Sequence, residues 1–191
     1  LVKFRSSFKK MQTSGQSILK LTEIYSSVQG ESSYAGLPCV FIRLSGCPLR
    51  CRWCDTVYSF KDGQPYSLDA LLTEVDKFQI PLVELTGGEP LAQPLAFELV
   101  RSLADAGKKV LIETGGSESI KDVDQRAHVI MDIKFPGSGM NEKNLYSNIE
   151  FLKPTDEIKF VVASREDFDW AVKTIKEFRL EQKCRLLVSP A

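Results

Sequence analysis

Three cysteines in one short segment are the residues of this sequence best suited to chemistry: Cys47, Cys51 and Cys54. Their C-x3-C-x2-C spacing places three thiolates in one loop with no fourth cysteine nearby. A closed tetrahedral zinc site takes four ligands, and an iron–sulfur cluster held by protein alone takes four thiolates. Three thiolates therefore leave one position of a bound metal group free for another molecule. This incomplete ligand set indicates a reactive metal centre.

Two other interpretations of the cysteines stay open on spacing alone. A remote fourth ligand would complete a structural zinc site, although the single histidine, His128, lies in an apolar run typical of a strand. Cys39 and Cys184 are isolated in strand-like segments and fit small core side chains. A disulfide is the other interpretation, but the cysteine count of five is odd and no signal-peptide pattern is visible. This cysteine usage favours a reducing cytoplasm.

Composition limits the class of function. The 191 residues suit one domain, and the 43% that are hydrophobic are enough to bury a sizeable core. Lysine plus arginine and aspartate plus glutamate both count 25, so the formal net charge is zero. Nucleic-acid-binding surfaces are marked by a basic excess, and no apolar run of this sequence approaches the roughly 20 residues that span a bilayer. We therefore expect a protein that acts on a small molecule, without nucleic-acid or membrane partners.

The start of the sequence differs from the rest. We expect a mobile N-terminal arm over residues 1–20, because Leu1 to Gln16 is polar, basic and without clear periodicity. Residues 21–191 are expected to form one domain. Because the sequence stops at Ala191 just as a strand-like run finishes, we also expect native sequence beyond that residue.

Strand-like and helix-like segments alternate after the arm. A short strand is expected at 21–25, and six further strands are expected at 38–44, 82–85, 109–113, 129–133, 158–162 and 185–188. Helices are expected at 68–78 behind a Ser67 cap, at 94–106 before Gly107, at 167–178 and, more weakly, at 145–152. Strand–helix alternation predicts parallel strands. Six units are too few for a closed eight-stranded barrel, so we expect an α/β fold, an open partial (β/α)6 barrel.

Polar motifs follow the expected strands at their carboxyl ends. They are the cysteine loop, Gly87-Gly88-Glu89, Thr114 and the segment Asp132–Lys134. In barrels and open α/β sheets the carboxyl edge of the strands holds the active site. The sequence therefore predicts that these motifs meet at one site.

The cysteine loop followed by Gly87-Gly88-Glu89-Pro90 resembles the radical S-adenosylmethionine (SAM) superfamily. More narrowly, the sequence resembles the 7-carboxy-7-deazaguanine synthase family of queuosine biosynthesis, over about residues 21–191. Four stretches carry this resemblance: Tyr25-Ser26-Ser27-Val28-Gln29-Gly30-Glu31, Cys51-Arg52-Trp53-Cys54-Asp55-Thr56, Met131-Asp132-Ile133-Lys134 and Asp156-Glu157-Ile158-Lys159-Phe160-Val161.

The resemblance implies two cofactors at the cysteine loop. The three thiolates hold three irons of a [4Fe–4S] cluster, and the fourth iron binds the methionine part of SAM. The glycine pair permits close approach of backbone to that part, and the Glu89 carboxylate accepts from its ammonium group. The remaining cofactor-binding residues implied by the family are Trp53, Cys54, Asp55, Gly87, Gly88, Thr114, Asp132, Ile133, Lys134 and Ser189. An ion pair at the strand end is the alternative role for Asp132 and Lys134.

The resemblance also implies the substrate, 6-carboxy-5,6,7,8-tetrahydropterin, and residues that bind it. These residues are Val28, Gln29, Gly30, Glu31, Arg43 and Thr86. An amide and a carboxylate suit the ring's donors and acceptors, and the guanidinium of Arg43 suits the substrate carboxylate. A structural ion pair with a glutamate is the alternative for Arg43. Thr56 corresponds to the family's Mg²⁺ position, where waters and substrate oxygens supply the other ligands.

The implied reaction is a radical ring contraction to 7-carboxy-7-deazaguanine, with loss of ammonia and regeneration of SAM. The family further implies a cytoplasmic homodimer that receives electrons from a donor such as flavodoxin. Two alternatives belong to other classes: a glycyl-radical enzyme activase, which acts on a protein, and a non-enzymatic metal-binding module with structural zinc. Metal content distinguishes the module, and a small polar pocket beside the cysteines distinguishes the activase.

Overall fold

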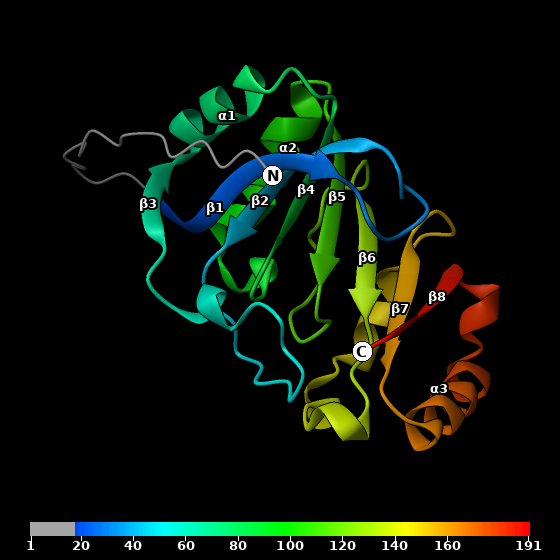
Figure 1. Ribbon diagram of the computed structural model, residues 1–191. Coiled ribbons are helices and arrows are strands. Elements are labelled where there is room, and N and C mark those ends of the chain that lie inside the picture. Colours follow the sequence, from blue (N-terminus) through cyan, green and yellow to red (C-terminus); the bar gives the residue numbers. More distant parts are fainter. Residues whose placement is uncertain (1–17) are drawn as a thin grey trace.

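One eight-stranded sheet organises residues 18–191, the part of the chain that the computed structural model describes (Figure 1). The strand order is β3-β1-β2-β4-β5-β6-β7-β8. Six of these strands run parallel: β2 (Pro38–Leu44), β4 (Leu82–Gly87), β5 (Lys109–Thr114), β6 (His128–Asp132), β7 (Glu157–Val162) and β8 (Arg185–Pro190). The predicted α/β architecture with six parallel strands is confirmed. Because β3 and β8 lie at opposite ends of the order, the sheet is open.

Two antiparallel strands extend the sheet at its β2 edge. β1 (Ile18–Val28) pairs with β2, and β3 (Gln64–Ser67) pairs with the beginning of β1. β1 is longer than the strand expected at 21–25 and includes residues 18–20 of the predicted arm, because Leu19 and Leu21 alternate into the core. The rest of that predicted arm, residues 1–17, lies outside the described residues. β3 was not expected, since its four residues carry little strand pattern.

Three α-helices cover one face of the sheet: α1 (Leu68–Lys77), α2 (Leu95–Asp105) and α3 (Arg165–Phe178). Figure 1 shows α1 and α2 against the part of the sheet around β1 to β5, and α3 beside β7 and β8. The predicted Ser67 cap is confirmed, because its hydroxyl accepts a hydrogen bond from the Ala70 amide at 3.3 Å. No helix of residues 18–191 is long and apolar enough to cross a membrane.

Two connections between parallel strands lack an α-helix. Residues 115–127 join β5 to β6 through turns, and the expected helix at 145–152 is a 3₁₀ helix, Tyr146–Phe151. The buried Asn148 explains this packing: its side chain accepts from the Ile120 amide and donates to the Glu118 carbonyl. The amide thus ties the two connections together. The other 3₁₀ helices are Val57–Phe60, Pro90–Ala92, Pro136–Ser138, Asn141–Lys143 and Leu180–Gln182.

The two faces of the parallel sheet differ in chemistry because side chains alternate along each strand. On β2, Val40, Ile42 and Leu44 belong to the main core beneath the helices. Phe41 and Arg43 point to the opposite face. That second face has a small apolar cluster, made of Cys39, Phe41, Leu82, Leu111 and Ile130. Polar side chains occupy the same face nearer the carboxyl ends of the strands, where the cavity described below opens.

Candidate active site

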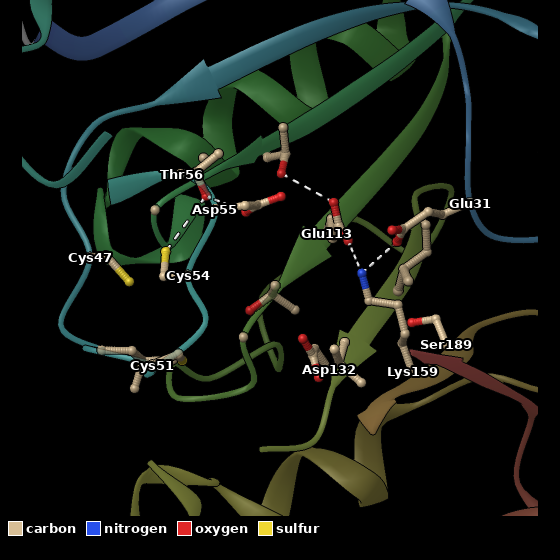
Figure 2. A pocket seen from close by; sticks show the side chains of 18 of the residues that line it. Glu31, Cys47, Cys51, Cys54, Asp55, Thr56, Glu113, Asp132, Lys159 and Ser189 are labelled. Atoms are coloured by element: carbon tan, nitrogen blue, oxygen red, sulfur yellow. Dashed lines mark hydrogen bonds and ion pairs between the residues drawn. The ribbon is translucent and has the colours of Figure 1, made fainter. Parts of the chain in front are cut away.

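A cavity of about 470 Å³ lies at the carboxyl ends of the parallel strands. It brings together most of the residues that the sequence predicts for the site. Those that line it are Gln29, Gly30, Glu31, Arg43, Cys47, Cys51, Trp53, Cys54, Asp55, Thr56, Thr86, Gly87, Gly88, Thr114, Asp132, Lys134 and Ser189. Figure 2 shows the cysteine loop on one side of the cavity and the charged strand residues on the other.

Three of the predicted residues do not line this cavity. Val28 is 59% exposed at the end of β1, and Ile133 is buried on the other side of its segment, against the main core. Glu89 is fully buried behind the cavity wall. The alternation of side chains in extended backbone accounts for Val28 and Ile133, since Gln29 and Asp132 next to them face the cavity.

Strand register explains why distant residues meet in this cavity. Arg43 on β2 lies opposite Thr86 on β4, and Asp132 on β6 lies opposite Lys159 on β7. Glu113 on β5 lies opposite Ile130. These side chains therefore occupy one face of the sheet near its carboxyl edge, the position at which open α/β sheets bind ligands.

The cysteine loop is shaped by hydrogen bonds of its own. Gly46 begins it with a φ of 93°, a conformation that favours glycine, and its amide donates to the Ser59 carbonyl at 2.7 Å. The Arg50 guanidinium donates to the carbonyls of Cys47 and Leu49 at 2.7 and 2.6 Å. The same group lies 4.2 Å from the centre of the Phe60 ring. Arg50 therefore holds the turn between the first two cysteines.

The donor set of this loop fits an iron–sulfur cluster with one free iron. Cys47, Cys51 and Cys54 are free thiols, all three line the same cavity, and the other two cysteines lie elsewhere. Burial raises the pKa of Cys47 and Cys51, so binding of iron would have to displace their protons. Among residues 18–191, no three Cys, His, Asp or Glu side chains form a ready-made metal site. The fit therefore rests on thiol chemistry and on the shared cavity.

Gly87 and Gly88 bring the end of β4 into direct backbone contact with the cysteine loop. The Gly88 amide donates to the Leu44 carbonyl, and the Glu89 amide donates to the Gly46 carbonyl at 2.9 Å. A Cβ on Gly88 would lie 2.3 Å from the Gly46 oxygen and 2.7 Å from Cβ of Cys47. The glycines are thus required by packing against the cysteine loop, in addition to any approach to a ligand.

The Glu89 carboxylate joins the ends of β4 and β5. One oxygen accepts from the Leu91 amide and the Thr114 hydroxyl, and the other accepts from the Gly115 amide at 2.7 Å. Burial raises the pKa of Glu89 to about 7, while these hydrogen bonds oppose the shift. Because both oxygens are occupied within the protein, the carboxylate acts here as a brace for the cavity wall.

Asp132 and Lys134 form an ion pair with each other, with Nζ and Oδ2 2.5 Å apart. Although burial opposes it, the Asp132 carboxylate raises the pKa of Lys134. The Lys134 backbone is fixed by Asn144, whose side chain accepts from its amide and donates to its carbonyl. Asp132 and Lys134 therefore form the strand-end ion pair that was the alternative expectation. Both side chains also line the cavity.

Arg43 is paired and also lines the cavity. Its Nε donates to Glu23 at 2.9 Å, and one Nη donates to the Tyr25 hydroxyl at 3.3 Å. The Tyr58 hydroxyl donates to the same Glu23 oxygen at 2.9 Å. The pairing with Glu23 compensates the guanidinium for burial, and it fixes the side chain at the cavity wall.

Sequence reasoning missed three charged residues of the cavity: Glu84, Glu113 and Lys159. The Lys159 ammonium contacts Glu113 and also Glu31, the latter at 2.6 Å. The Thr86 hydroxyl donates to Glu113 at 3.3 Å, and the Gln29 amide donates to Glu84. A signal was present, because each of the three charges directly follows an apolar residue within a predicted strand. A charge in such a position is costly unless it has a partner or a ligand.

The surroundings of Glu84, Glu113 and Lys159 shift their pKa values in different directions. Burial raises the pKa of Glu84 to about 9, and the adjacent Glu113 carboxylate adds to this shift. Burial also opposes ionisation of Glu113, but the Lys159 ammonium outweighs it and lowers the pKa of Glu113. Despite burial, the Glu113 and Asp132 carboxylates raise the pKa of Lys159. At neutral pH the cavity therefore contains a neutral Glu84 beside an ionised Glu113.

Comparisons with known proteins agree with this geometry. The family model described as the radical SAM superfamily matches residues 41–184. A 7-carboxy-7-deazaguanine synthase of Koribacter versatilis is 44% identical over 176 residues, which cover 91% of this chain and 78% of the relative. The synthase of the same name from Chlorobaculum tepidum is 43% identical over 175 residues, with 90% and 80% covered.

A solved structure shows the same fold. The crystal structure of QueE from Escherichia coli superposes with a TM-score of 0.77 over 93% of this chain and 86% of that one, at 24% identity. The structure of TYW1 with a lysine–pyruvate adduct bound gives a lower TM-score of 0.56, at 13% identity and 78% coverage of this chain. The likeness extends over nearly all of the described sheet in the first case.

Gly88→Ala is expected to lower the iron and sulfide bound per chain severalfold, because the added Cβ collides with the backbone at Gly46 and pushes the cysteine loop out of place. Gly30→Ala is the matched control, since a Cβ at Gly30 has no neighbour within 4 Å. Iron and sulfide analysis after anaerobic reconstitution measures the effect. Equal iron content in the two variants would contradict the packing argument.

Glu89→Gln is expected to lower the free energy of unfolding by about 1–3 kcal/mol, because the amide group turns a donor toward other donors. Chemical denaturation measures this change, and SAM affinity should fall with it as the cavity wall loosens. Glu98→Gln, on the exposed side of α2, is the control. If Glu89→Gln were as stable as the control and bound SAM more weakly, the carboxylate would contact SAM directly. That result would contradict the structural role of Glu89 in the cavity wall.

Proposed function

Because this chain belongs to the radical SAM superfamily and, within it, to the 7-carboxy-7-deazaguanine synthase family, we propose that it converts 6-carboxy-5,6,7,8-tetrahydropterin to 7-carboxy-7-deazaguanine with loss of ammonia. This is a lyase reaction in the pathway to queuosine and related 7-deazapurines. One observation carries the proposal: three free thiols, a Gly-Gly turn and a face of polar strand residues all open on the same cavity.

The cysteine loop is the proposed site of the [4Fe–4S] cluster and of SAM. Cys47, Cys51 and Cys54 would hold the cluster, and the backbone of Gly87 and Gly88 would lie against the methionine part of SAM. When bound, the two groups supply a 5′-deoxyadenosyl radical by reductive cleavage of SAM. Trp53 and Asp55 lie on the same loop and are proposed to complete the SAM site. Both side chains line the cavity beside the cysteines.

The polar strand face is the proposed substrate site. Ligand cavities usually measure about 300–1,000 Å³, and a cavity of about 470 Å³ suits a bicyclic ring beside SAM. Glu31 presents a carboxylate to the substrate ring, and Gln29 and Thr86, whose side chains also bond within the protein, each keep a further donor or acceptor position for it. Arg43 faces the cavity with its charge fixed by Glu23, which orients it for the substrate carboxylate.

The wall near β6 and β8 is the proposed site of the nucleoside part of SAM. Thr114, Asp132, Lys134 and Ser189 line the cavity there. A carboxylate such as Asp132 accepts from ribose hydroxyls, and hydroxyl groups both donate and accept. The Asp132–Lys134 pair supports this assignment, because it holds the carboxylate in place at the cavity wall.

Four further parts of the proposal come first from the family. Mg²⁺ is proposed at Thr56, which lines the cavity two residues after Cys54 and whose hydroxyl lies 3.2 Å from Asp55. Mg²⁺ keeps several waters and takes other ligands from the substrate, so one hydroxyl is enough protein contact. We also propose a homodimer, a flavodoxin-type electron donor and a cytoplasmic location, which the free thiols favour.

Two other functions make different use of the same residues. A glycyl-radical enzyme activase would need the cysteine loop but acts on a protein. It would therefore not need the polar cavity residues Gln29, Glu84, Glu113 and Lys159. A metal-binding module would use the cysteines for structural zinc and would need no cavity. The charged face of the cavity favours the synthase over both.

The direct test is anaerobic reconstitution with iron and sulfide, followed by incubation with the pterin, SAM and a reductant. We expect a brown protein that forms 7-carboxy-7-deazaguanine and ammonia. Cys51→Ser should lose activity completely, because one iron of the cluster loses its ligand. Cys184→Ser is the matched control and should keep activity, since Cys184 lies outside the cavity.

Two results would contradict the proposal. One is the absence of product at every reductant concentration from a protein with a full cluster. The other is a colourless protein with one zinc per chain after anaerobic purification, which would support the metal-binding module.

A further inference from the structure

Two carboxyl groups on adjacent strands meet in the cavity. Glu84 on β4 and Glu113 on β5 lie on the same sheet face, both line the cavity, and their carboxyl groups are close enough to interact electrostatically. Two neighbouring carboxylates repel each other when both are ionised, so a proton on one of them is favoured. The pair therefore holds one proton at neutral pH.

The surroundings decide which carboxyl group keeps the proton. Glu113 contacts the Lys159 ammonium and accepts from the Thr86 hydroxyl, so its charged form is stabilised. Glu84 is 2% exposed, and its Oε2 accepts from the Gln29 amide, a neutral donor. The proton therefore resides on Glu84, and Glu113 beside it is ionised.

A closed ring of polar contacts fixes this pair. Lys159 also holds Glu31 at 2.6 Å, and the Glu31 backbone amide donates to the Gln29 side chain at 2.8 Å. The ring runs from Gln29 through Glu84, Glu113 and Lys159 to Glu31 and back. Each member is positioned by its two neighbours, which keeps the two carboxyl groups together at the wall of the cavity.

We propose that Glu84 and Glu113 form the acid–base pair that removes ammonia from the ring-contracted intermediate. This inference rests on the proposed synthase function. The radical steps move hydrogen atoms and rearrange the ring, but loss of ammonia is an elimination that needs a proton donor and a proton acceptor. Within residues 18–191, this pair offers both at one place in the cavity.

The step balances without an oxidant or reductant. Glu84 gives its proton to the leaving amino group as the carbon–nitrogen bond breaks, and the bonding electrons leave with the nitrogen as ammonia. Glu113 takes the proton from the neighbouring carbon, and the electrons of that carbon–hydrogen bond form the new double bond of the five-membered ring. The proton then returns from Glu113 to the neighbouring Glu84 carboxylate, which restores the starting state.

The alternative for Glu84 is a purely structural role as a neutral hydrogen-bonding group. Glutamine has the shape of a protonated glutamate, accepts from Gln29 and donates to Glu113, but it has no acidic proton to give. Glu84→Gln therefore keeps the ring of contacts and removes only the proposed chemistry.

The experiment uses reconstituted holoenzyme with SAM deuterated at the 5′ position and the pterin substrate. Glu84→Gln is expected to bind the pterin and to exchange deuterium from SAM within about threefold of the unaltered protein. Release of ammonia and of product should fall roughly 100-fold, the usual size of a lost general acid. A ring-contracted amine should accumulate and be detected by mass spectrometry. Glu98→Gln on α2 is the matched control.

The pH dependence gives a second measurement. Because only the protonated form of Glu84 is active, product release should decline as pH rises through its pKa, which burial raises to about 9. The residual activity of Glu84→Gln should lack this decline. Other titratable and charged groups that face the pair are Cys39, Glu31, Lys134 and Lys159, and none of these is changed in the variant.

Two outcomes overturn the inference while leaving the proposed function intact. If Glu84→Gln releases product at the rate of the unaltered protein, the carboxyl group is structural. If the variant loses deuterium exchange together with product, Glu84 acts before the elimination. Failure of the unaltered holoenzyme to turn over the pterin would instead count against the proposed function.

Discussion

The close backbone contact between the cysteine loop and the end of β4 is the constraint on which the rest of the site depends. Gly88 and Glu89 donate to Leu44 and Gly46, so the Gly-Gly turn and the thiols share one wall. The Glu89 side chain extends this contact to Thr114 and Gly115 at the end of β5. Three strand ends are thereby held together by hydrogen bonds, and those that Glu89 accepts from Leu91 and Thr114 are buried, where little water competes for them.

The opposite wall depends on charge rather than on backbone packing. Lys159 holds Glu31 and Glu113, and the neutral Glu84 links them to Gln29. A network of this kind is costly to bury and stays fixed only when every member has a partner. The protein thus offers a rigid loop for the cofactors and a set of paired charges for the substrate. The strand register places both on one cavity of a size suited to small molecules.

Much of this arrangement follows from the sequence, and the exceptions have physical causes. The apolar pattern predicted the six parallel strands, and the same pattern with the Ser67 cap predicted α1. Motifs that follow the strands predicted that the cysteine loop and Gly88 belong to the site. Glu89 had no sequence signal for a bracing role, because its partners at Thr114 and Gly115 are set by register between strands. Lys159 and its partners are likewise joined only by folding. Local pattern predicts elements, whereas contacts across strands require the sheet.

The three thiols and the charged strand face are proposed to serve one reaction in one cavity. An anaerobic crystal structure of the reconstituted protein with SAM and the pterin tests it most directly. We expect a cluster on Cys47, Cys51 and Cys54, SAM on its free iron, and the pterin between Arg43 and Glu31. A zinc ion with a fourth protein ligand at the cysteines, or a pterin bound outside this cavity, would contradict it.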